Sequence, residues 1–298
     1  MPFDPPERLN IADRFLTARL EEGAADRVAL HLDDGPRTYA QVDAHANRIG
    51  NVLAAMGVTH ERRVIIALPD GEDYVAALFG TLKLGGVVVM VSAELTVAHL
   101  ASVLERTRAT AVVSDATTAP ALLDARAQAG ANPPLLLTRG AGSADLQLAP
   151  GDRTLADEDP PTTLATADTH RDDPAIWLFS GGTTGTPKIT VQPHRSFANT
   201  EACYARSVIG YRPDDVTISV PKLYFGYATG SALFFPFAVG ASTILFAERP
   251  TPQAVATRIA RHGATILITV PKLVLAMVSD RDLRPQQLAS LRLATSAG

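Results

Sequence analysis

Short apolar strands that alternate with amphipathic helices constrain this chain more than any other feature of its sequence. Residues 63–69, 87–91 and 111–115 are apolar runs without alternation, which predicts strands buried on both faces. Over 41–56, 72–85 and 97–108 apolar residues recur every three or four positions, which predicts helices packed by one face. Strands and helices in this order form βαβ units. We therefore expect an α/β fold with parallel-rich sheets flanked by helices.

The same rhythm returns in the second half of the chain. Further strands are expected at 176–179, 216–220, 243–247 and 265–270, and further helices at 196–207, 252–262 and 271–279. The intervening residues 140–175 contain no aromatic side chain and are rich in Ala, Gly, Pro, Asp and Thr. We expect a first α/β subdomain over 1–139, a surface linker over 140–175, and a second α/β subdomain over 176–298.

Composition and charge narrow the class of protein. The 298 residues are 46% hydrophobic, and 27 basic side chains stand against 31 acidic ones, so the chain has the composition of a folded protein. No basic patch stands out that would release the counterions of a nucleic acid, so we expect no nucleic-acid partner. The single cysteine, Cys203, excludes an internal disulfide and a cysteine-rich metal site.

Targeting and membrane signals are weak in this sequence. Residues 1–10 lack the basic and then apolar run of a signal peptide. The most apolar stretch, 74–93, is interrupted by Lys83 and by Gly85-Gly86, which predicts a buried helix followed by a buried strand. We expect a cytoplasmic protein without a membrane partner.

The densest chemical signal is the segment W-L-F-S-G-G-T-T-G-T-P-K over residues 177–188. Glycines let backbone N–H groups approach a ligand closely, and hydroxyls and a lysine add further donors, a combination that suits a polyphosphate. The candidate phosphate-binding residues are Ser180, Gly181, Gly182, Thr183, Thr184, Gly185, Thr186 and Lys188. The pattern is neither a Walker A loop nor a dinucleotide fingerprint. A flexible linker with a solvated lysine is the alternative, and the strand expected directly before the loop argues against it.

This loop resembles the phosphate-binding loop of the AMP-forming acyl-CoA synthetase and adenylation-domain superfamily. The family pattern is usually written S-S-G-T-T-G-x-P-K-G, with serine or threonine at its first and fourth positions. Residues 182–188 match it, whereas Gly181 stands where serine is usual and Ile189 where glycine is usual. Two earlier segments, T-Y-A-Q at 38–41 and L-K-L-G-G at 82–86, resemble two other motifs of the family in the same order.

A later segment, P-K-L-Y-F-G-Y-A-T-G over residues 221–230, is similar to the acid-binding segment of the benzoate-CoA ligase branch. By this resemblance Phe225 would be an aromatic gate, and Gly226 and Tyr227 would line a pocket for an aryl ring. A small residue beside aromatic ones leaves a flat slot for a ring, so the residues themselves agree in kind. The alternative is that the aromatic residues of this segment fill a core, above all Phe234 and Phe235.

The end of the chain, T-S-A-G over 295–298, resembles the start of a family segment that packs against the acyl group and the adenine. It adds Ser296, Ala297 and Gly298 to the candidate acyl pocket. The family's adenine and magnesium motif, its ribose-binding aspartate and its carboxy-terminal domain with the catalytic lysine would follow. We therefore assign no catalytic residue and no metal ligand, and expect a truncated portion that is weakly active or inactive. His194, which the family often has at a helix entrance, is interpreted as structural rather than catalytic.

The resemblance implies an ATP-dependent ligase that converts an aromatic carboxylic acid to an acyl-AMP and then to an acyl-CoA. It implies ATP, Mg²⁺ and coenzyme A as cofactors or co-substrates, a small-molecule carboxylic acid as the partner, and leaves a homodimer open. Two alternatives stay open as well: a non-catalytic fragment that binds nucleotide or acyl groups, and an adenylating enzyme that loads a carrier-protein thiol. The sequence does not discriminate benzoate from its hydroxy, amino or heteroaryl relatives.

Overall fold

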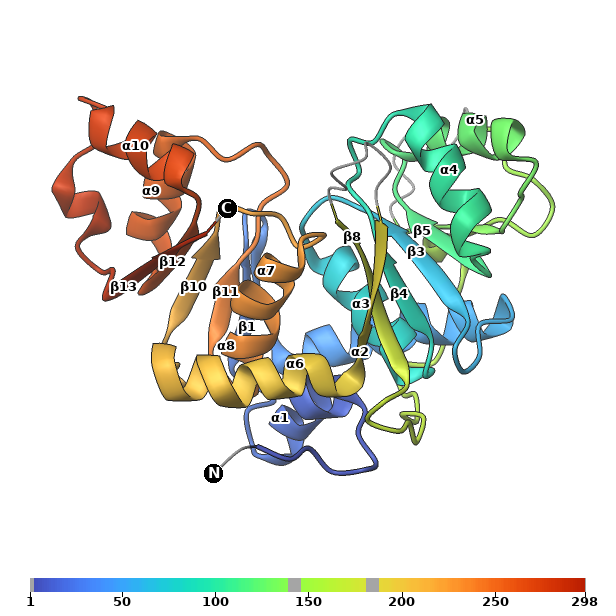
Figure 1. Ribbon diagram of the computed structural model, residues 1–298, viewed down its shortest axis with the longest axis horizontal. Coiled ribbons are helices and arrows are strands. Elements are labelled where there is room, and N and C mark those ends of the chain that lie inside the picture. Colours follow the sequence, from blue (N-terminus) through green and yellow to red (C-terminus); the bar gives the residue numbers. More distant parts are fainter. Residues whose placement is uncertain (1–2, 139–145, 181–187, 298) are drawn as a thin grey trace.

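The computed structural model describes residues 3–138, 146–180 and 188–297, and its strands form two sheets flanked by helices (Figure 1). The seven-stranded sheet has the order β7-β6-β5-β3-β4-β8-β9, and every neighbouring pair is parallel except β8 and β9. Its strands are β3 (Arg63–Ala67), β4 (Val87–Met90), β5 (Ala111–Ser114), β6 (Leu135–Leu137), β7 (Arg153–Thr154), β8 (Pro174–Ser180) and β9 (Lys188–Pro193). The expected strands in 63–69, 87–91 and 111–115 are confirmed. Each residue of β4 and β5 is buried, which explains why these strands show no alternation.

The six-stranded sheet has the order β13-β12-β10-β11-β1-β2. Its strands are β1 (Val28–Leu32), β2 (Gly35–Thr38), β10 (Val216–Ser219), β11 (Ser242–Ile244), β12 (Ile266–Thr269) and β13 (Leu293–Ser296). The strands are parallel except for β1 and β2, which form an antiparallel pair at one edge. The strand expected at 243–247 begins one residue earlier and ends at Ile244.

Each sheet combines strands from both halves of the chain. β1 lies near the start of the sequence but pairs with β11, Leu30 standing opposite Thr243. β8 begins at the end of the range 140–175 but pairs with β4, Val88 standing opposite Ile176. The two sheets therefore do not coincide with the ranges 1–139 and 176–298, and that division of the chain stays a prediction.

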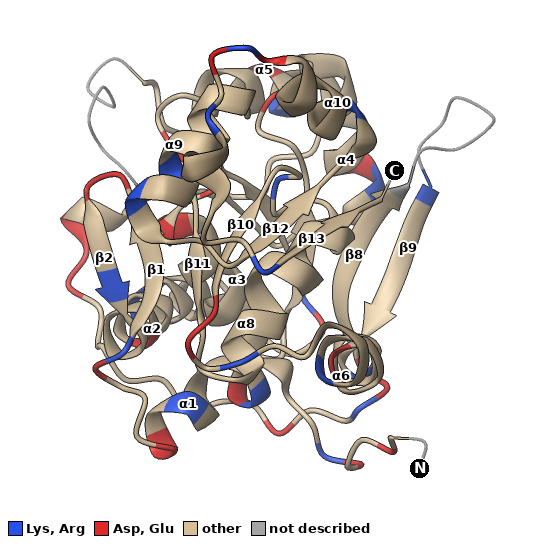
Figure 2. Cartoon of the chain, turned by 90° about the vertical axis from the view of Figure 1, so that its left-hand side faces the viewer, with Lys and Arg blue, Asp and Glu red and all other residues tan. Residues whose placement is uncertain are grey.

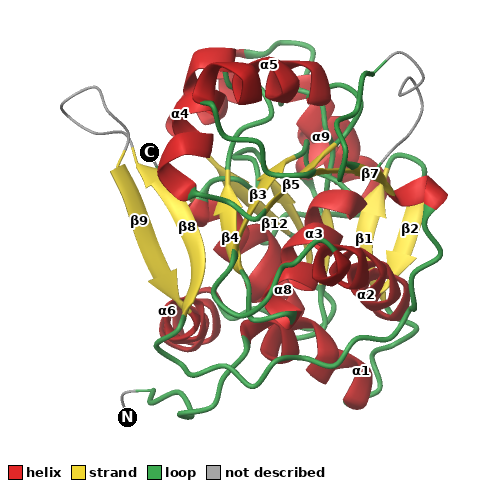
Figure 3. Cartoon of the chain, turned by 90° about the vertical axis from the view of Figure 1, so that its right-hand side faces the viewer, coloured by secondary structure: helices red, strands yellow, loops and turns green. Residues whose placement is uncertain are grey.

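Helices cover the sheets (Figures 1 and 3), and the buried side chains form three groups. The helices are α1 (Ala18–Glu21), α2 (Tyr39–Ala55), α3 (Glu72–Lys83), α4 (Val97–Thr107), α5 (Ala119–Ala129), α6 (His194–Thr200), α7 (Gly226–Ala228), α8 (Phe235–Ala238), α9 (Pro252–His262) and α10 (Pro271–Ser279). Asp13–Thr17, Glu201–Ile209 and Thr229–Phe234 are π-helical segments, and Leu155–Asp157 and Pro285–Leu288 are short 3₁₀-helices.

The largest core takes residues from both sheets and has aromatic rings at its centre. Phe234 is fully buried and stacks on Phe15 with ring centroids 4.7 Å apart. Phe79 and Phe197 meet the same ring edge-on at 5.9 and 4.9 Å. Such pairs contribute about 0.5–1.5 kcal/mol each beyond burial. Phe234 is thus a core residue, as the structural alternative for this segment expected.

α2 and α3 pack unusually closely because two glycines face each other. A Cβ on Gly80 would lie 2.6 Å from the carbonyl oxygen of Ala46 and 2.9 Å from the backbone nitrogen of Gly50. Beside this contact Lys83 is 1% exposed, and its Nζ lies 2.5 Å from Asp43 Oδ1 and 2.7 Å from Asn47 Oδ1. The ammonium is buried but paired, which is what makes its burial tolerable.

The T-Y-A-Q segment begins α2 as a capping box. The backbone N–H of Gln41 donates to Thr38 Oγ1, and the backbone N–H of Thr38 donates to Gln41 Oε1 at 2.9 Å. Two donors that the first helical turn leaves open are satisfied in this way. The T-Y-A-Q segment, which resembles a family motif, therefore has a structural role as the start of α2.

Charged side chains of both signs are spread over helices and loops around the molecule (Figure 2). Among the residues that the structure describes, no helix combines the length and apolar composition that a bilayer span requires. The expected pair of a buried helix and a buried strand over 74–93 is confirmed as α3 and β4.

Candidate functional site

The candidate phosphate loop connects the two strands at the edge of the seven-stranded sheet. β8 and β9 are antiparallel, and Ser180 at the end of β8 stands opposite Lys188 at the start of β9. Gly181, Gly182, Thr183, Thr184, Gly185 and Thr186 lie outside the described residues. The two ends of the segment are therefore placed side by side, which is the geometry that a glycine-rich loop between them requires.

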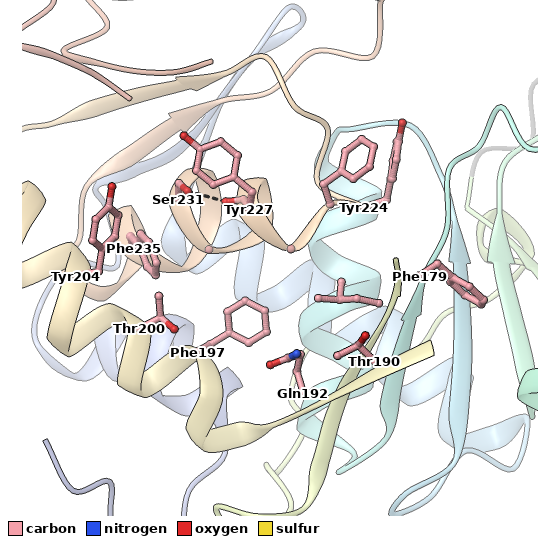
Figure 4. Close-up of a pocket in the computed structure, with 14 residues that line it drawn as sticks. Phe179, Thr190, Gln192, Phe197, Thr200, Tyr204, Tyr224, Tyr227, Ser231 and Phe235 are labelled. Carbon is pink, nitrogen blue, oxygen red and sulfur yellow. Dashed lines mark hydrogen bonds between the residues drawn. The ribbon is translucent and has the colours of Figure 1, made fainter. Parts of the chain in front are cut away.

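A cavity of about 490 Å³, which we call the aromatic pocket, lies beside this hairpin (Figure 4). β8 and β9 form one wall, the helix that begins at α6 forms another, and α7 with the helical turn after it forms the third. The lining residues are Leu178, Phe179, Thr190, Gln192, Phe197, Thr200, Tyr204, Tyr224, Phe225, Gly226, Tyr227, Gly230, Ser231 and Phe235. Most of this surface is aromatic or aliphatic with a few polar groups, which is typical of a site for a small organic ligand.

Three of the predicted acyl-pocket residues line this cavity. Phe225 is half exposed, and its ring lies 4.4 Å from that of Tyr224. Gly226 faces β8 so closely that a Cβ there would lie 2.7 Å from Leu178 Cδ1. Tyr227 packs at the edge of the main core and lines the pocket from α7. Phe235 also lines it, although only 3% of that residue is exposed.

The predicted residues at the end of the chain lie beside the pocket rather than in its wall. Ser296 ends β13 and Ala297 follows it, and both are exposed. Their neighbour Thr295 has its hydroxyl oxygen 2.7 Å from the phenol oxygen of Tyr227, so β13 is linked to α7. Gly298 lies outside the described residues.

Several pocket residues were missed by the sequence reasoning. Thr190 and Gln192 lie two residues apart on β9 and so point to one face of the strand. Phe197, Thr200 and Tyr204 are spaced by three and four residues along one helical face. These two periodicities, directly after the phosphate loop, are the signal that could have found them.

A second cavity, of about 420 Å³, adjoins the first and we call it the α4 pocket. Its lining residues are Met90, Val91, Ser92, Leu95, His99, Ser102, Val103, Arg106, Phe179, Tyr224 and Phe225. Phe179, Tyr224 and Phe225 line both cavities. These three aromatic side chains therefore form a partition between the aromatic pocket and the α4 pocket.

A third, more polar cavity of about 260 Å³ lies next to the partition and is lined by a buried carboxylate and a partly buried lysine. Asp70, Lys222 and Tyr224 are among its lining residues. Burial raises the pKa of Asp70 to about 6, although Lys222 and a hydrogen bond from the Leu223 N–H oppose this rise. Burial also lowers the pKa of Lys222, and the charge of Asp70 opposes that fall.

His194 occupies the first position of α6 and is fully buried. Its Nδ1 accepts the backbone N–H of Ile11 at 3.2 Å, while its Nε2 is buried without a hydrogen-bond partner. Burial lowers the pKa of His194 to about 4, so the ring is neutral at pH 7. It does not line the aromatic pocket, which agrees with a structural role.

One group of side chains in the described part of the chain has the spacing of a metal site. The ligand atoms of His60, Glu61 and Asp173 lie within 4.8 Å of one another, but His60 and Glu61 are exposed. His60 Nε2 already lies 3.1 Å from Asp173 Oδ2. The cluster lies apart from the pockets, and we assign no metal to it.

The chain belongs to the AMP-binding enzyme family, which matches residues 17–298. Within that family, its relatives include enzymes named for aromatic acids. It is 34% identical over 296 residues to the benzoate–CoA ligase of Thauera aromatica, covering 98% of this chain and 54% of that one. It is also 34% identical to the 4-hydroxybenzoate–CoA/benzoate–CoA ligase of Rhodopseudomonas palustris, with 99% and 54% covered. The chain thus spans about half the length of these relatives.

Solved structures give the same picture of the fold. An anthranilate CoA ligase in complex with anthranoyl-AMP superposes with a TM-score of 0.91 at 30% identity, over 99% of this chain and 56% of that one. A benzoate CoA ligase from Burkholderia xenovorans superposes with a TM-score of 0.85 at 31% identity, over 97% and 56%. The expected α/β fold and the expected family are both confirmed.

Proposed function

We propose that this protein activates an aromatic carboxylic acid with ATP and passes the acyl group to the thiol of coenzyme A. A carboxylate oxygen attacks the α-phosphorus, pyrophosphate leaves, and an acyl-AMP forms. The thiol sulfur then attacks the acyl carbon, and AMP leaves. Relatives named as benzoate–CoA ligases support this assignment.

One observation carries the proposal. Both strands that flank the candidate phosphate loop also contribute to the aromatic pocket, Leu178 and Phe179 from β8 and Thr190 and Gln192 from β9. A ring held in this pocket would be close to a polyphosphate held at the end of the hairpin. Proximity of the two reactants is the main requirement of a reaction between two anions.

One group of residues would bind the aryl ring of the acid, and another would bind the phosphates of ATP. Phe225, Gly226 and Tyr227 would hold the aryl ring, with Ser296, Ala297 and Gly298 closing the site from β13. Lys188 and the backbone and hydroxyl donors of 180–186 would neutralise the phosphates, since charge-assisted hydrogen bonds contribute about 1.5–3 kcal/mol each. Magnesium would add positive charge to the phosphates when bound. Among the described residues that line the aromatic pocket none is Asp or Glu, so we assign no ligand to this ion.

Equilibrium binding to the 298-residue chain tests the proposal. We expect calorimetry to detect benzoate and ATP, and Lys188→Ala to weaken ATP binding about 10- to 100-fold while benzoate binding is unchanged. Lys272→Ala, which removes an exposed lysine from α10, is the matched control and should alter neither. A wild-type chain that binds neither benzoate nor ATP would contradict the proposal.

A second candidate differs only in the thiol acceptor. A p-hydroxybenzoic acid–AMP ligase of Mycobacterium tuberculosis is 27% identical over 97% of this chain, and its name stops at the adenylate. Pyrophosphate release that depends on benzoate, with no benzoyl-CoA after coenzyme A is added, would favour an enzyme that loads a carrier-protein thiol. Binding of ligands without any pyrophosphate would favour a non-catalytic binding fragment.

A further inference from the structure

Two of the three partition residues lie in a short turn that precedes α7, and the third, Phe179, lies on β8. This turn, Pro221–Phe225, carries Tyr224 and Phe225, and both side chains line the aromatic pocket and the α4 pocket. Phe225 is half exposed, and its ring contacts that of Tyr224. Tyr224 also packs against the main core, whereas Phe225 does not, so the position of the Phe225 ring depends mainly on the backbone of the turn.

Hydrogen bonds hold that backbone from within. The N–H of Phe225 donates to the carbonyl of Lys222 at 3.0 Å, and Thr229 Oγ1 donates to the carbonyl of Leu223 at 2.6 Å. The N–H of Thr229 in turn donates to the carbonyl of Phe225 at 3.0 Å. These bonds define the shape of the turn but do not attach it to the two sheets.

Side chains attach the turn to each sheet, and two of them are charged. Ser219 at the end of β10 donates its hydroxyl to the carbonyl of Pro221 at 2.7 Å, and Thr229 Oγ1 lies 3.8 Å from Met90 Sδ on β4. Asp70 follows β3 of the seven-stranded sheet, and its Oδ1 accepts the N–H of Leu223 at 2.9 Å in a buried contact. Lys222 reaches the six-stranded sheet, where its Nζ donates to the carbonyl of Phe246 beyond β11 at 2.5 Å and lies 4.1 Å from the Phe246 ring centroid. The turn is thus held to a residue after β3 on one side and to a residue after β11 on the other.

Asp70 is buried and Lys222 is partly buried, and both charged groups have polar partners. Asp70 is 9% exposed, and it shares a small cavity with Lys222 and Tyr224. Buried ionised groups contribute little net stability compared with apolar residues of the same volume. Hydrogen bonds that involve an ionised group are stronger than neutral ones, so the bonds of the Asp70 carboxylate and the Lys222 ammonium hold the turn in one position.

We propose that Asp70 and Lys222 are positioning residues that set the Tyr224–Phe225 partition and thereby the size of acid that the aromatic pocket accepts. The inference rests on the proposed function, because it names what determines ring selectivity at that site. Neither Asp70 nor Lys222 lines the aromatic pocket, so neither would contact the ring of a bound acid. They act through the turn, and loosening it would let the two cavities, of about 490 and 420 Å³, communicate.

The test compares an acid that fits with a larger one. The dissociation constants of benzoate and 2-naphthoate are measured by calorimetry for the wild-type chain and for Asp70→Leu, Asp70→Asn, Lys222→Met and Lys222→Arg. We expect Asp70→Leu and Lys222→Met to shift the ratio of the two constants about tenfold in favour of naphthoate. Asp70→Asn keeps an acceptor oxygen and Lys222→Arg keeps the charge, so both should shift the ratio about threefold or less.

Controls separate positioning from general loss of stability. Lys83→Met and Asp215→Asn remove buried charged groups that line none of the three cavities. They should change thermal unfolding but leave the ratio of the two dissociation constants unchanged. If Asp70→Leu unfolds, Lys222→Met decides the question.

The possible outcomes are distinct. A wild-type chain that binds neither acid overturns the proposed function, and this inference with it. A wild-type chain that binds benzoate, with a ratio unchanged in both Asp70→Leu and Lys222→Met or equally shifted in the two controls, overturns this inference alone. A shift confined to the Asp70 and Lys222 variants, with partial recovery in Lys222→Arg, supports it.

Discussion

The phenol oxygen of Tyr227 lies 2.7 Å from the hydroxyl oxygen of Thr295, and this hydrogen bond joins α7 to the edge strand β13. The two residues belong to segments that were assigned to the acyl pocket from separate stretches of sequence, 68 positions apart. Partial burial raises the pKa of Tyr227, so the phenol is protonated at neutral pH and able to donate. The bond links the wall of the aromatic pocket to the strand that leads into Ser296 and Ala297.

Removing either hydroxyl should destabilise the chain by the same modest amount. A hydrogen bond of this kind contributes about 0.5–1.5 kcal/mol, so Tyr227→Phe and Thr295→Val should each lower the free energy of unfolding by that much. The double variant should lose little more than either single one, because the two changes remove one shared interaction. Urea denaturation of the four proteins measures the coupling, and strictly additive losses would show that the hydroxyls do not interact.

Adding one methyl group at Gly226 should reduce binding in the aromatic pocket. The new Cβ would lie 2.7 Å from Leu178 Cδ1, a flexible side-chain end that must move within the lining of the cavity. We expect Gly226→Ala to weaken benzoate binding about three- to tenfold with little change in stability. Shortening the neighbour in the double variant Gly226→Ala/Leu178→Val should restore most of the affinity. Unchanged binding in the single variant would argue that the ring does not reach this wall.

The capping box at the start of α2 should matter for stability and not for binding. Thr38→Ala removes the hydroxyl that accepts the N–H of Gln41, and the loss of such a cap costs about 1 kcal/mol. Thr38→Ser keeps the acceptor and serves as the matched control. Thermal unfolding measures the difference, and a change in benzoate or ATP affinity would show that this motif does more than begin a helix.

The buried ring of His194 should make the fold sensitive to acid. Its pKa of about 4 in the folded chain lies below the usual value of 6.5, so its stabilising contribution is present above pH 6.5 and is lost as the pH falls through 4. The loss amounts to about 3 kcal/mol at full protonation. In His194→Asn, which keeps an acceptor for the N–H of Ile11, the fall in stability between pH 6.5 and 4 should be smaller by that amount.

A suitable control for this pH experiment is His99→Asn, which changes an exposed histidine on α4. Denaturant unfolding at pH 7, 5.5 and 4 compares the three proteins. Identical pH profiles in the wild-type chain and His194→Asn would show that His194 does not titrate in the way its burial requires.

Local sequence pattern was sufficient for the strands and helices that bury a continuous apolar surface. β3, β4 and β5 are apolar at nearly every position, and α4 and α9 have clear apolar faces. β9 was not expected, because it is an edge strand and none of its residues Lys188–Pro193 is buried. α5 was not expected either, since its apolar residues do not gather on one face.

Features that depend on contacts between distant residues could not be read from the sequence. Nothing in V-A-L-H-L over 28–32 shows that β1 pairs with β11, more than two hundred positions later. The aromatic pocket likewise takes its walls from β8, β9, α6 and α7, and only the Phe225–Tyr227 part carries a recognisable motif. The anchoring of that motif by Asp70 crosses from one sheet to the other, so no local pattern could indicate it.

The most direct test of the account is the binding of a stable acyl-adenylate analogue, 5′-O-(N-benzoylsulfamoyl)adenosine, to the 298-residue chain. This molecule carries the ring and the adenosine together, so it occupies the aromatic pocket and the region beside the phosphate loop at once. We expect the analogue to bind more tightly than benzoate or AMP alone, and we expect Gly226→Ala to weaken its binding whereas Lys272→Ala does not. An analogue that fails to bind, or that binds equally to wild type and Gly226→Ala, would contradict the assignment of this cavity to an aromatic acyl group.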